Sequence, residues 1–277
     1  MPLYINSNIS SLEAQRALSR TQNKMQRSFE RLSSGFRINT AADDAAGLGV
    51  SEGLKARIRS FSVAERNTTS GLNMARTAES GLGEISGIVI RMRELAVQSA
   101  NGDLNSTDRG YINTEFQLLK GEIDRLAAAT EFNGKELLHG AAANISFQVG
   151  VTTTTSDTIS VSFGGIGTTS LGITAGTAVS GSNSALSNAA ISALDSALTT
   201  VSTKRANFGG AANRLQIALT SAQTIRTNLE AANSAIRDVD VAEETSMLAR
   251  SQVLLQAGTS VLAQANQQPS LALSLLR

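Results

Sequence analysis

Apolar side chains recur at helical spacing near both ends of the chain. The first stripe runs through Ile5, Ile9, Leu12, Leu18, Met25, Phe29 and Leu32. Near the other end, two adjacent rows step by seven residues: Val241, Leu248, Leu255 and Leu262, and Met247, Leu254 and Val261. A stripe sustained over heptads is typical of a helix that packs against other helices. We predict one helix over about 5–35 and another after residue 240.

The C-terminal stripe lies in a segment without charge. No charged side chain occurs between Arg250 and Arg277, but glutamine and asparagine interrupt the apolar face. No window holds 18 uninterrupted apolar residues, so a transmembrane helix is not expected. A long apolar face left open would be a large adhesive patch. The pattern therefore predicts that other chains complete this end of the molecule.

Longer helices are predicted between the two ends. Helical spacing continues from Leu72 to Ser99 and again from Ile112 to Leu126, where Ser106 or Thr107 is the expected N-cap. The last long stripe steps by seven through Leu194, Val201, Phe208, Leu215, Ala222, Leu229 and Ile236. Gly209-Gly210 lies inside it, where glycine costs about 1 kcal/mol per residue relative to alanine. We expect this pair to pack closely or to bend the helix.

The hydrophobic pattern and the composition change over residues 141–182. Period-two alternation over 144–151 and 158–163 predicts a β-hairpin, followed by a loop rich in Gly, Ser and Thr. Asn133-Gly134, just before it, is a strong turn signal. The expected fold class is mainly α: an elongated antiparallel helical bundle or coiled coil with a small β-hairpin insertion and with the N- and C-terminal helices paired.

Charge supports the pairing of the two ends. Residues 1–42 carry six basic and two acidic side chains, whereas residues 238–277 carry four acidic and two basic ones. Each exposed ion pair adds only about 0–1 kcal/mol, so this is a supporting argument. The net charge of +1 gives no case for binding nucleic acid, and the absence of Cys excludes disulfides and thiolate metal sites. The first residues do not resemble a cleavable signal peptide.

No motif of enzymatic chemistry is found. Asp43-Asp44 is interpreted as acids at the start of a helix, in preference to a metal site. His139 has no partner His or Cys, and the glycines at 164, 165 and 167 lack the Lys-Ser/Thr of a phosphate-binding loop. We therefore expect no catalytic residues, no metal and no cofactor.

Several long motifs resemble one family. SSGFRINTAADDAAGLGVSEGLKARI at 33–58 and IRMRELAVQSANG at 90–102 are similar to the N-terminal signatures of bacterial flagellin. EFNGKELL at 131–138 resembles the loop before the family's β-hairpin, and residues 237–277 resemble its C-terminal region. The middle is very short for a flagellin, so the resemblance implies a form that lacks the outer variable domains.

The resemblance implies a structural subunit of the flagellar filament, used for motility. Residues 1–42 with 238–277 would form an inner coiled-coil core domain, 43–140 with 183–237 a helical rod domain, and 141–182 the β-hairpin and its loop. The chain would be secreted unfolded through flagellar type III export without signal cleavage, and would polymerise at the tip of an extracellular filament. Its implied partners are further copies of itself, an export chaperone, and the cap and hook-junction proteins, with no nucleic acid and no membrane insertion.

The resemblance also implies two groups of site residues. Subunit packing in the inner core is assigned to Ile9, Leu12, Leu18, Met25, Leu32, Leu248, Leu255, Leu262, Leu275 and Leu276. Toll-like receptor 5 is a further candidate partner, with Arg91, Glu94, Leu95, Gln98 and Glu115 as the matching positions. Subunit contacts are the alternative role of Arg91 and Glu94. The Ser/Thr-rich stretch 152–184 is either a site of O-glycosylation or an unmodified polar loop.

Two other functions remain open from the sequence. A hook–filament junction protein would have similar termini, although the motifs at 90–102 and at the C-terminus favour the filament subunit. A helical receptor ligand or adhesin-like module is the alternative from another class. That alternative predicts no polymer at high concentration or on seeding.

Overall fold

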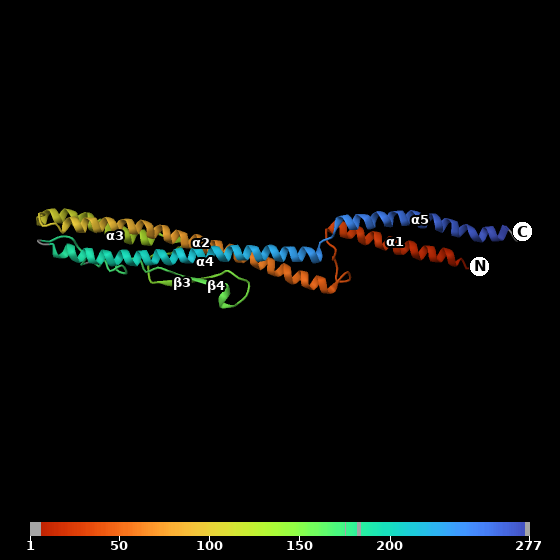
Figure 1. Cartoon of the computed structure of the whole chain (residues 1–277), viewed down its shortest axis with the longest axis horizontal. Coiled ribbons are helices and arrows are strands. Elements are labelled where there is room, and N and C mark those ends of the chain that lie inside the picture. Colours follow the sequence, from red (N-terminus) through yellow and green to blue (C-terminus); the bar gives the residue numbers. More distant parts are fainter. Residues whose placement is uncertain (1–6, 175, 182–183, 275–277) are drawn as a thin grey trace. The chain divides into compact units, whose positions relative to one another are not determined.

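The structure is mainly helical, as the sequence predicts. The computed structural model describes residues 7–174, 176–181 and 184–274. Its helices are α1 (Ile9–Ser34), α2 (Ala45–Ser99), α3 (Ser106–Ala129), α4 (Ala185–Arg237) and α5 (Val241–Ser274), as Figure 1 shows. The strands are β1 (Glu131–Phe132), β2 (Lys135–Glu136), β3 (Ala143–Gln148) and β4 (Thr158–Phe163), with one 3₁₀ turn at Thr155–Asp157.

The chain divides into two compact units. Unit 1 combines the residues up to Ile58 with those from Thr227 onward, and unit 2 is Arg59–Arg226. The division falls within α2 and α4. The extents of the functional domains given above remain predictions.

Unit 1 is built on an antiparallel pair, α1 with α5, so the predicted pairing of the terminal helices is confirmed. Ser11 Oγ donates to Asn266 Oδ1 at 2.7 Å, and Arg31 meets Glu244 at the other end of the pair. Helix α1 ends at Gly35, whose φ of +75° gives the left-handed cap that glycine adopts without a Cβ clash. Asn8 caps its start by accepting from Ser11 N.

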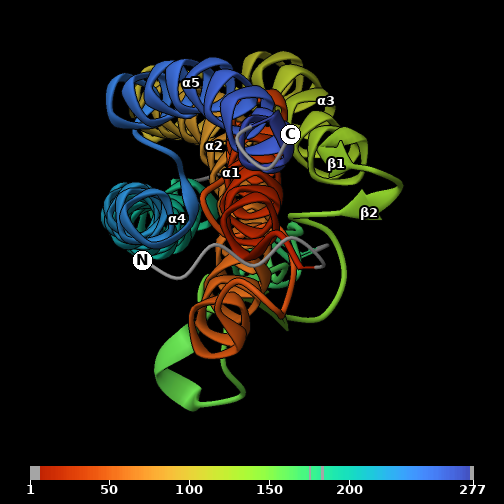
Figure 2. The ribbon, with the colours of Figure 1, turned by 90° about the vertical axis from the view of Figure 1, so that its right-hand side faces the viewer.

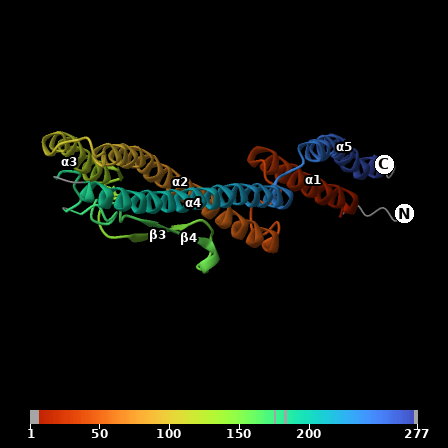
Figure 3. The same cartoon turned by 60° about the vertical axis from the view of Figure 1, so that its left-hand side comes forward.

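Unit 2 packs α2, α3 and α4 side by side, as Figures 1 and 3 both show. Its core contains the largest fully buried side chains of the described residues. They are Phe116, Phe163, Leu82, Ile85, Met92, Leu95, Ile123, Leu137, Leu138, Ile166, Ile173 and Leu194. An apolar row at 3–4 spacing on each helix explains why these helices pack together.

Two small hairpins complete unit 2. In the predicted one, β3 and β4 pair antiparallel with Phe147 opposite Ile159, and Phe163 of β4 stacks at 5.2 Å on Phe208 of α4. The other, β1–β2, follows directly on α3 (Figure 2) and turns at Asn133 and Gly134. Both turn residues have positive φ, which is the geometry that Asn-Gly favours.

Two local expectations were wrong. Asn105, rather than Ser106 or Thr107, is the N-cap of α3, and it forms a capping box with Asp108. The sequence offers three consecutive capping residues there, so pattern alone does not choose between them. Close packing at Gly209 and Gly210 was the other wrong expectation, because a Cβ at either would meet nothing within 4 Å. Helix α4 continues through both, and a bend at this site stays a prediction.

Candidate assembly surface

The contact between α1 and α5 follows a strict heptad on both helices. On α1 the row of buried and half-buried positions is Ser11, Ala14, Leu18, Thr21, Met25, Ser28 and Leu32, and Arg31 is half-buried beside it. On α5 they are Glu244, Leu248, Ser251, Leu255, Gly258, Leu262 and Ala265. These two rows are called the inner seam below. Steps of three and four residues on antiparallel helices give a coiled-coil contact.

The inner seam contains small and polar side chains between its leucines. Its most buried members are Ser11, Ser28, Ser251, Glu244 and Ala265. At Gly258 a Cβ would lie 3.0 Å from Leu18 Cδ1, so glycine permits a close approach there. The seam therefore buries less apolar surface than a leucine-rich coiled coil of the same length.

A second apolar row on α5 is left open. Met247, Leu254 and Val261 are 43%, 54% and 55% exposed, and Val253 beside them is 65% exposed. On α1, Phe29 is 50% exposed. Contiguous apolar patches of this kind mark interaction sites in soluble proteins. We call Met247, Val253, Leu254 and Val261 the open stripe.

A buried acid anchors one end of the inner seam. Glu244 is 5% exposed, lies in the first turn of α5, and meets Arg31 Nη1 of α1 at 3.5 Å. The partial positive charge of the helix N-terminus favours a carboxylate at this place. Asp240 caps the same helix by accepting from Ala242 N and Glu243 N.

The two connections between the helices of unit 1 are tied together. Arg37 N donates to Arg237 O at 2.6 Å and Val239 N to Gly35 O at 3.1 Å. The Arg237 guanidinium lies 4.5 Å above the Phe36 ring and also bonds Glu52, which lowers the pKa of that carboxyl below its usual range. A cation over an aromatic face adds about 0.5–1 kcal/mol at exposed sites.

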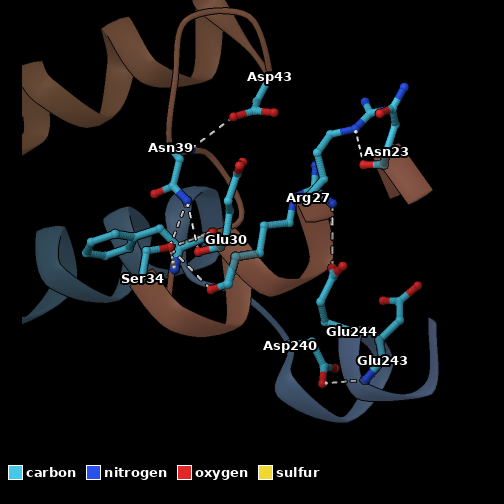
Figure 4. A network of polar contacts seen from close by, with 11 residues as sticks. Asn23, Arg27, Glu30, Ser34, Asn39, Asp43, Asp240, Glu243 and Glu244 are labelled. Atoms are coloured by element: carbon cyan, nitrogen blue, oxygen red, sulfur yellow. Dashed lines mark hydrogen bonds and ion pairs between the residues drawn. The ribbon is translucent and has the colours of Figure 1, made fainter. Parts of the chain in front are cut away.

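Polar contacts around residues 23–43 hold the end of α1 and the turn that follows it (Figure 4). Asn39 Nδ2 donates to Glu30 O and to Ser34 Oγ. Asp43 accepts from the backbone and hydroxyl of Thr40, which lowers the pKa of Asp43. Asp44 accepts from Gly47 N and so caps α2, which refines its interpretation as an acid inside the first turn.

The predicted packing residues separate into three groups. Leu18, Met25, Leu32, Leu248, Leu255 and Leu262 lie half-buried in the inner seam of one chain. Ile9 and Leu12 are 56% and 52% exposed and remain available to other chains. Leu275 and Leu276 lie outside the described residues. The contribution of each to contacts between subunits remains a prediction.

The receptor candidates lie on α2 and α3 around one ion-pair cluster. Arg91 bonds Glu94 at 3.0 Å on its own helix and Glu115 at 2.9 Å on α3, and these contacts raise its pKa. All three side chains are exposed, as is Gln98. Leu95 differs, because it is 2% exposed and packs in the core of unit 2. Its side chain is therefore not part of the surface that the other four share.

His139 and the glycines that follow β4 were weighed as candidate sites in the sequence. His139 Nδ1 lies 2.8 Å from Glu136, both are exposed, and the described residues hold no group of three His, Cys, Asp or Glu that fits a metal ion. Gly164 and Gly165 have positive φ and belong to a turn after β4. Within the ranges that the structure describes, no helix has the length and apolar character to cross a membrane.

Comparison with known proteins agrees with this architecture. Residues 5–143 match the family profile of the bacterial flagellin N-terminal helical region, and residues 191–276 match that of the C-terminal helical region. A flagellin of Halalkalibacterium halodurans is 39% identical over 275 residues, covering 99% of this chain and all of that protein. A flagellar filament 33 kDa core protein of Treponema phagedenis is also 39% identical, over 286 residues, with the same coverage.

A solved structure shares the fold at low sequence identity. It is that of a putative flagellar hook-associated protein from Vibrio parahaemolyticus, 16% identical, with a TM-score of 0.59. The match covers 71% of this chain and all of that one. Identity this low shows a common fold alone.

Proposed function

Because this chain belongs to the bacterial flagellin family, a family of structural proteins and not of enzymes, we propose that it is the self-assembling subunit of a flagellar filament. The observation that carries the proposal is the open stripe on α5 beside a polar inner seam. One chain leaves this surface uncovered, and copies of the same helices would cover it. Residues 1–42 with 238–277 would then be the inner domain of the filament.

Export and assembly follow from the same proposal. The subunit would leave the cell unfolded through the flagellar export apparatus, after a chaperone had covered its C-terminal helix. It would polymerise beneath the cap at the tip of an extracellular filament that begins at the hook junction. The absence of Cys suits a chain that must cross a narrow channel without forming disulfides.

Electron microscopy of seeded, purified protein tests the proposal. Long helical filaments are the expected result. The double variant Leu254→Asn/Val261→Asn should fold as a monomer but fail to extend seeds, because it removes two exposed apolar contacts of the open stripe. Gln256→Asn, on an exposed polar position of the same helix, is the matched control. Short caps on the seeds would favour a junction protein, and absence of any polymer would exclude the filament subunit.

A second proposal concerns Toll-like receptor 5. The exposed cluster of Arg91, Glu94, Gln98 and Glu115 supports it, since arginine within a well-ordered ion-pair network is a frequent hot spot of interfaces. In a receptor reporter assay, Arg91→Ala should reduce the response of monomeric protein more than Arg125→Ala does. Arg125 forms a comparable exposed ion pair with Glu122 on α3. Equal responses of the two variants would contradict the proposal.

A further inference from the structure

Three ion pairs join α2 to α4 within unit 2, where Figure 3 shows the helices side by side. They are Arg93–Asp195 at 2.6 Å, Glu79–Arg205 at 2.8 Å and Glu65–Arg226 at 2.7 Å. On α2 the three charged residues are fourteen positions apart; in chain order they are two acidic residues followed by one basic residue. On α4 the partners have the complementary signs in antiparallel order. We call these pairs the charge ladder.

Buried positions on both helices recur with a period of seven residues. On α2 one row of buried positions from residue 64 onward alternates in steps of four and three: Ala64, Thr68, Gly71, Ala75, Ala78, Leu82, Ile85, Val89, Met92, Ala96 and Ser99. Leu72, Met74 and Leu95 are buried beside this row. On α4 the buried positions Leu194, Val201, Phe208, Leu215 and Ala222 are seven apart. If α4 slipped by seven residues, one apolar row would again face the other. Heptad periodicity alone therefore specifies the register of these helices weakly.

Chain connectivity does not specify the register either. The partners of the charge ladder are separated by 102, 126 and 161 residues along the chain. A short turn fixes the offset of two adjacent helices, but α2 and α4 are joined by residues 100–184 and not by a short turn. Something within the helix–helix contact must distinguish the native register from one that is slipped by a heptad.

The charge ladder makes that distinction. After a slip of seven residues, Glu79 would face Leu198 or Ala212 in place of Arg205. Arg93 would face Asn188 or Ser202, and a slip in one direction would place Glu65 against Leu219. None of these positions carries an opposite charge, and charges set against aliphatic side chains lose solvation without compensation. A slip of seven residues would therefore break the set of three pairs, because their spacings of 21 and 10 residues on α4 do not repeat the spacing of fourteen on α2.

We propose that the charge ladder sets the register of α2 against α4, selecting one alignment among the heptad-related ones that the apolar rows permit. The inference is independent of the proposed function, because it concerns the folding of a single chain. The buried hydrogen bond from Ser187 Oγ to Ser99 Oγ is a second contact at one end of the pair. Within unit 1, Glu52–Arg237 and Ser51–Asn233 join the same two helices. The residues of these contacts are unchanged in every variant described next, so any shift in register is attributable to the substituted charges.

Spin-label distances measure the register directly. The chain has no Cys, so Asn73→Cys on α2 and Ser196→Cys on α4, both exposed positions, give two unique label sites. A slip of seven residues moves one label along the helix axis by about 10 Å. The first variant inverts the α2 charges (Glu65→Arg, Glu79→Arg, Arg93→Glu). The second adds the inverse changes on α4 (Arg226→Glu, Arg205→Glu, Asp195→Arg) and so restores complementarity.

The α2 inversion should shift the distance by about 10 Å or split it into several populations, and the combined variant should return the single native distance. A control inversion, Arg76→Glu with Glu84→Arg, alters exposed α2 residues that form no ion pair within the described ranges and should leave the distance unchanged. Loss of helical structure in the first variant, recovered in the second, would also support the proposal. A native distance in the first variant, or failure of the second to recover it, would overturn the proposal.

Discussion

Units 1 and 2 are both helical and both heptad-patterned, yet they bury very different side chains. Among the described residues, the buried hydrophobic side chains of unit 1 are Ile38 and Ala265, at 2% and 8% exposure. Unit 2 buries Phe116, Leu82, Ile85 and many others at 0% exposure. In unit 1 small and polar side chains, mostly serines, take the most buried positions of the inner seam. The leucines of the seam are only half-buried, and the apolar side chains of the open stripe are exposed.

The difference shows that the same heptad periodicity can place apolar side chains inside a monomer or on its surface. In unit 2 the apolar row faces the chain's own helices, so the folded monomer already gains its hydrophobic free energy. In unit 1 that gain is not made within one chain, because the open stripe is exposed; under the proposed function it would be made when other copies cover the stripe. A helical pair with a weak internal contact and an adhesive outer face is suited to form its stable structure within an assembly.

The largest expected effect is on proteolysis of the monomer. Limited digestion should remove roughly residues 1–40 and 238–277 and leave unit 2 intact, because unit 1 has little buried apolar surface and opens locally at small free-energy cost. Mass spectrometry of the fragments checks the boundaries. The same digestion of assembled filament is the control and should spare the ends. If these terminal residues resisted digestion in a dilute monomer, the proposed difference in stability between the two units would be wrong.

Truncating a core side chain should lower the free energy of unfolding more in unit 2 than in unit 1. Phe116→Ala in unit 2 should lower the free energy of unfolding by about 3–5 kcal/mol. Leu255→Ala in the inner seam should cost the monomer about 1 kcal/mol, because that side chain is only half-buried. Urea unfolding followed by circular dichroism measures both. Leu118→Ala, at a 71% exposed position, is the control and should change stability by less than about 0.5 kcal/mol. Equal losses at 116 and 255 would contradict the comparison.

A smaller effect is expected where the β3–β4 hairpin meets α2. A Cβ at Gly71 would lie 2.9 Å from the Phe147 ring, so Gly71→Val should displace the hairpin and cost about 1–3 kcal/mol. Hydrogen exchange of the β3 amides reports the displacement. Gly83→Val is the matched control, since a Cβ there meets nothing within 4 Å, and it isolates the effect of helix propensity. Adding Phe147→Ala to Gly71→Val should recover part of the loss.

The smallest effect concerns pH at the tip of that hairpin. Asp157 accepts from the Thr152 hydroxyl and backbone N–H, and these hydrogen bonds lower its pKa in the folded state. The stabilisation is therefore present above the unfolded-state pKa of about 3.9 and is lost as pH falls through the lower folded-state value. The protection of the Thr152 amide, taken as its exchange rate relative to the intrinsic rate at the same pH, should fall at low pH in the wild type. Asp157→Asn should lose that pH dependence, whereas Asp103→Asn should keep it.

Much of the fold was accessible from the sequence because helices and strands have different hydrophobic periods. The helices, the hairpin at 143–163 and the pairing of the ends follow from those periods. Which of two apolar rows on α5 faces α1 does not follow, since the row of Leu255 and the row of Leu254 are equally apolar. The choice depends on the small and polar side chains that accompany each row, such as Ser251 and Gly258, which permit close approach.

The candidate site was predicted less completely than the fold. Leu95 shares a motif with exposed charged residues, but its own helical position faces the core, and spacing from Arg91 alone does not reveal this. The charge ladder has a sequence signal in retrospect, because its α2 members stand fourteen residues apart. Its partners are more than 100 residues away, however, and only the three-dimensional pairing identifies them.

The contact between the two ends of the chain also has a consequence for the timing of folding. Asn8 bonds the carbonyl of Ala265, a separation of 257 residues. On a ribosome, α1 emerges first but has no partner until nearly the whole chain has been made. Contacts of such separation form late, after the more local ones of unit 2. A newly made chain therefore passes through a long interval in which unit 2 can fold while its N-terminal helix still waits for the last segment to be synthesised.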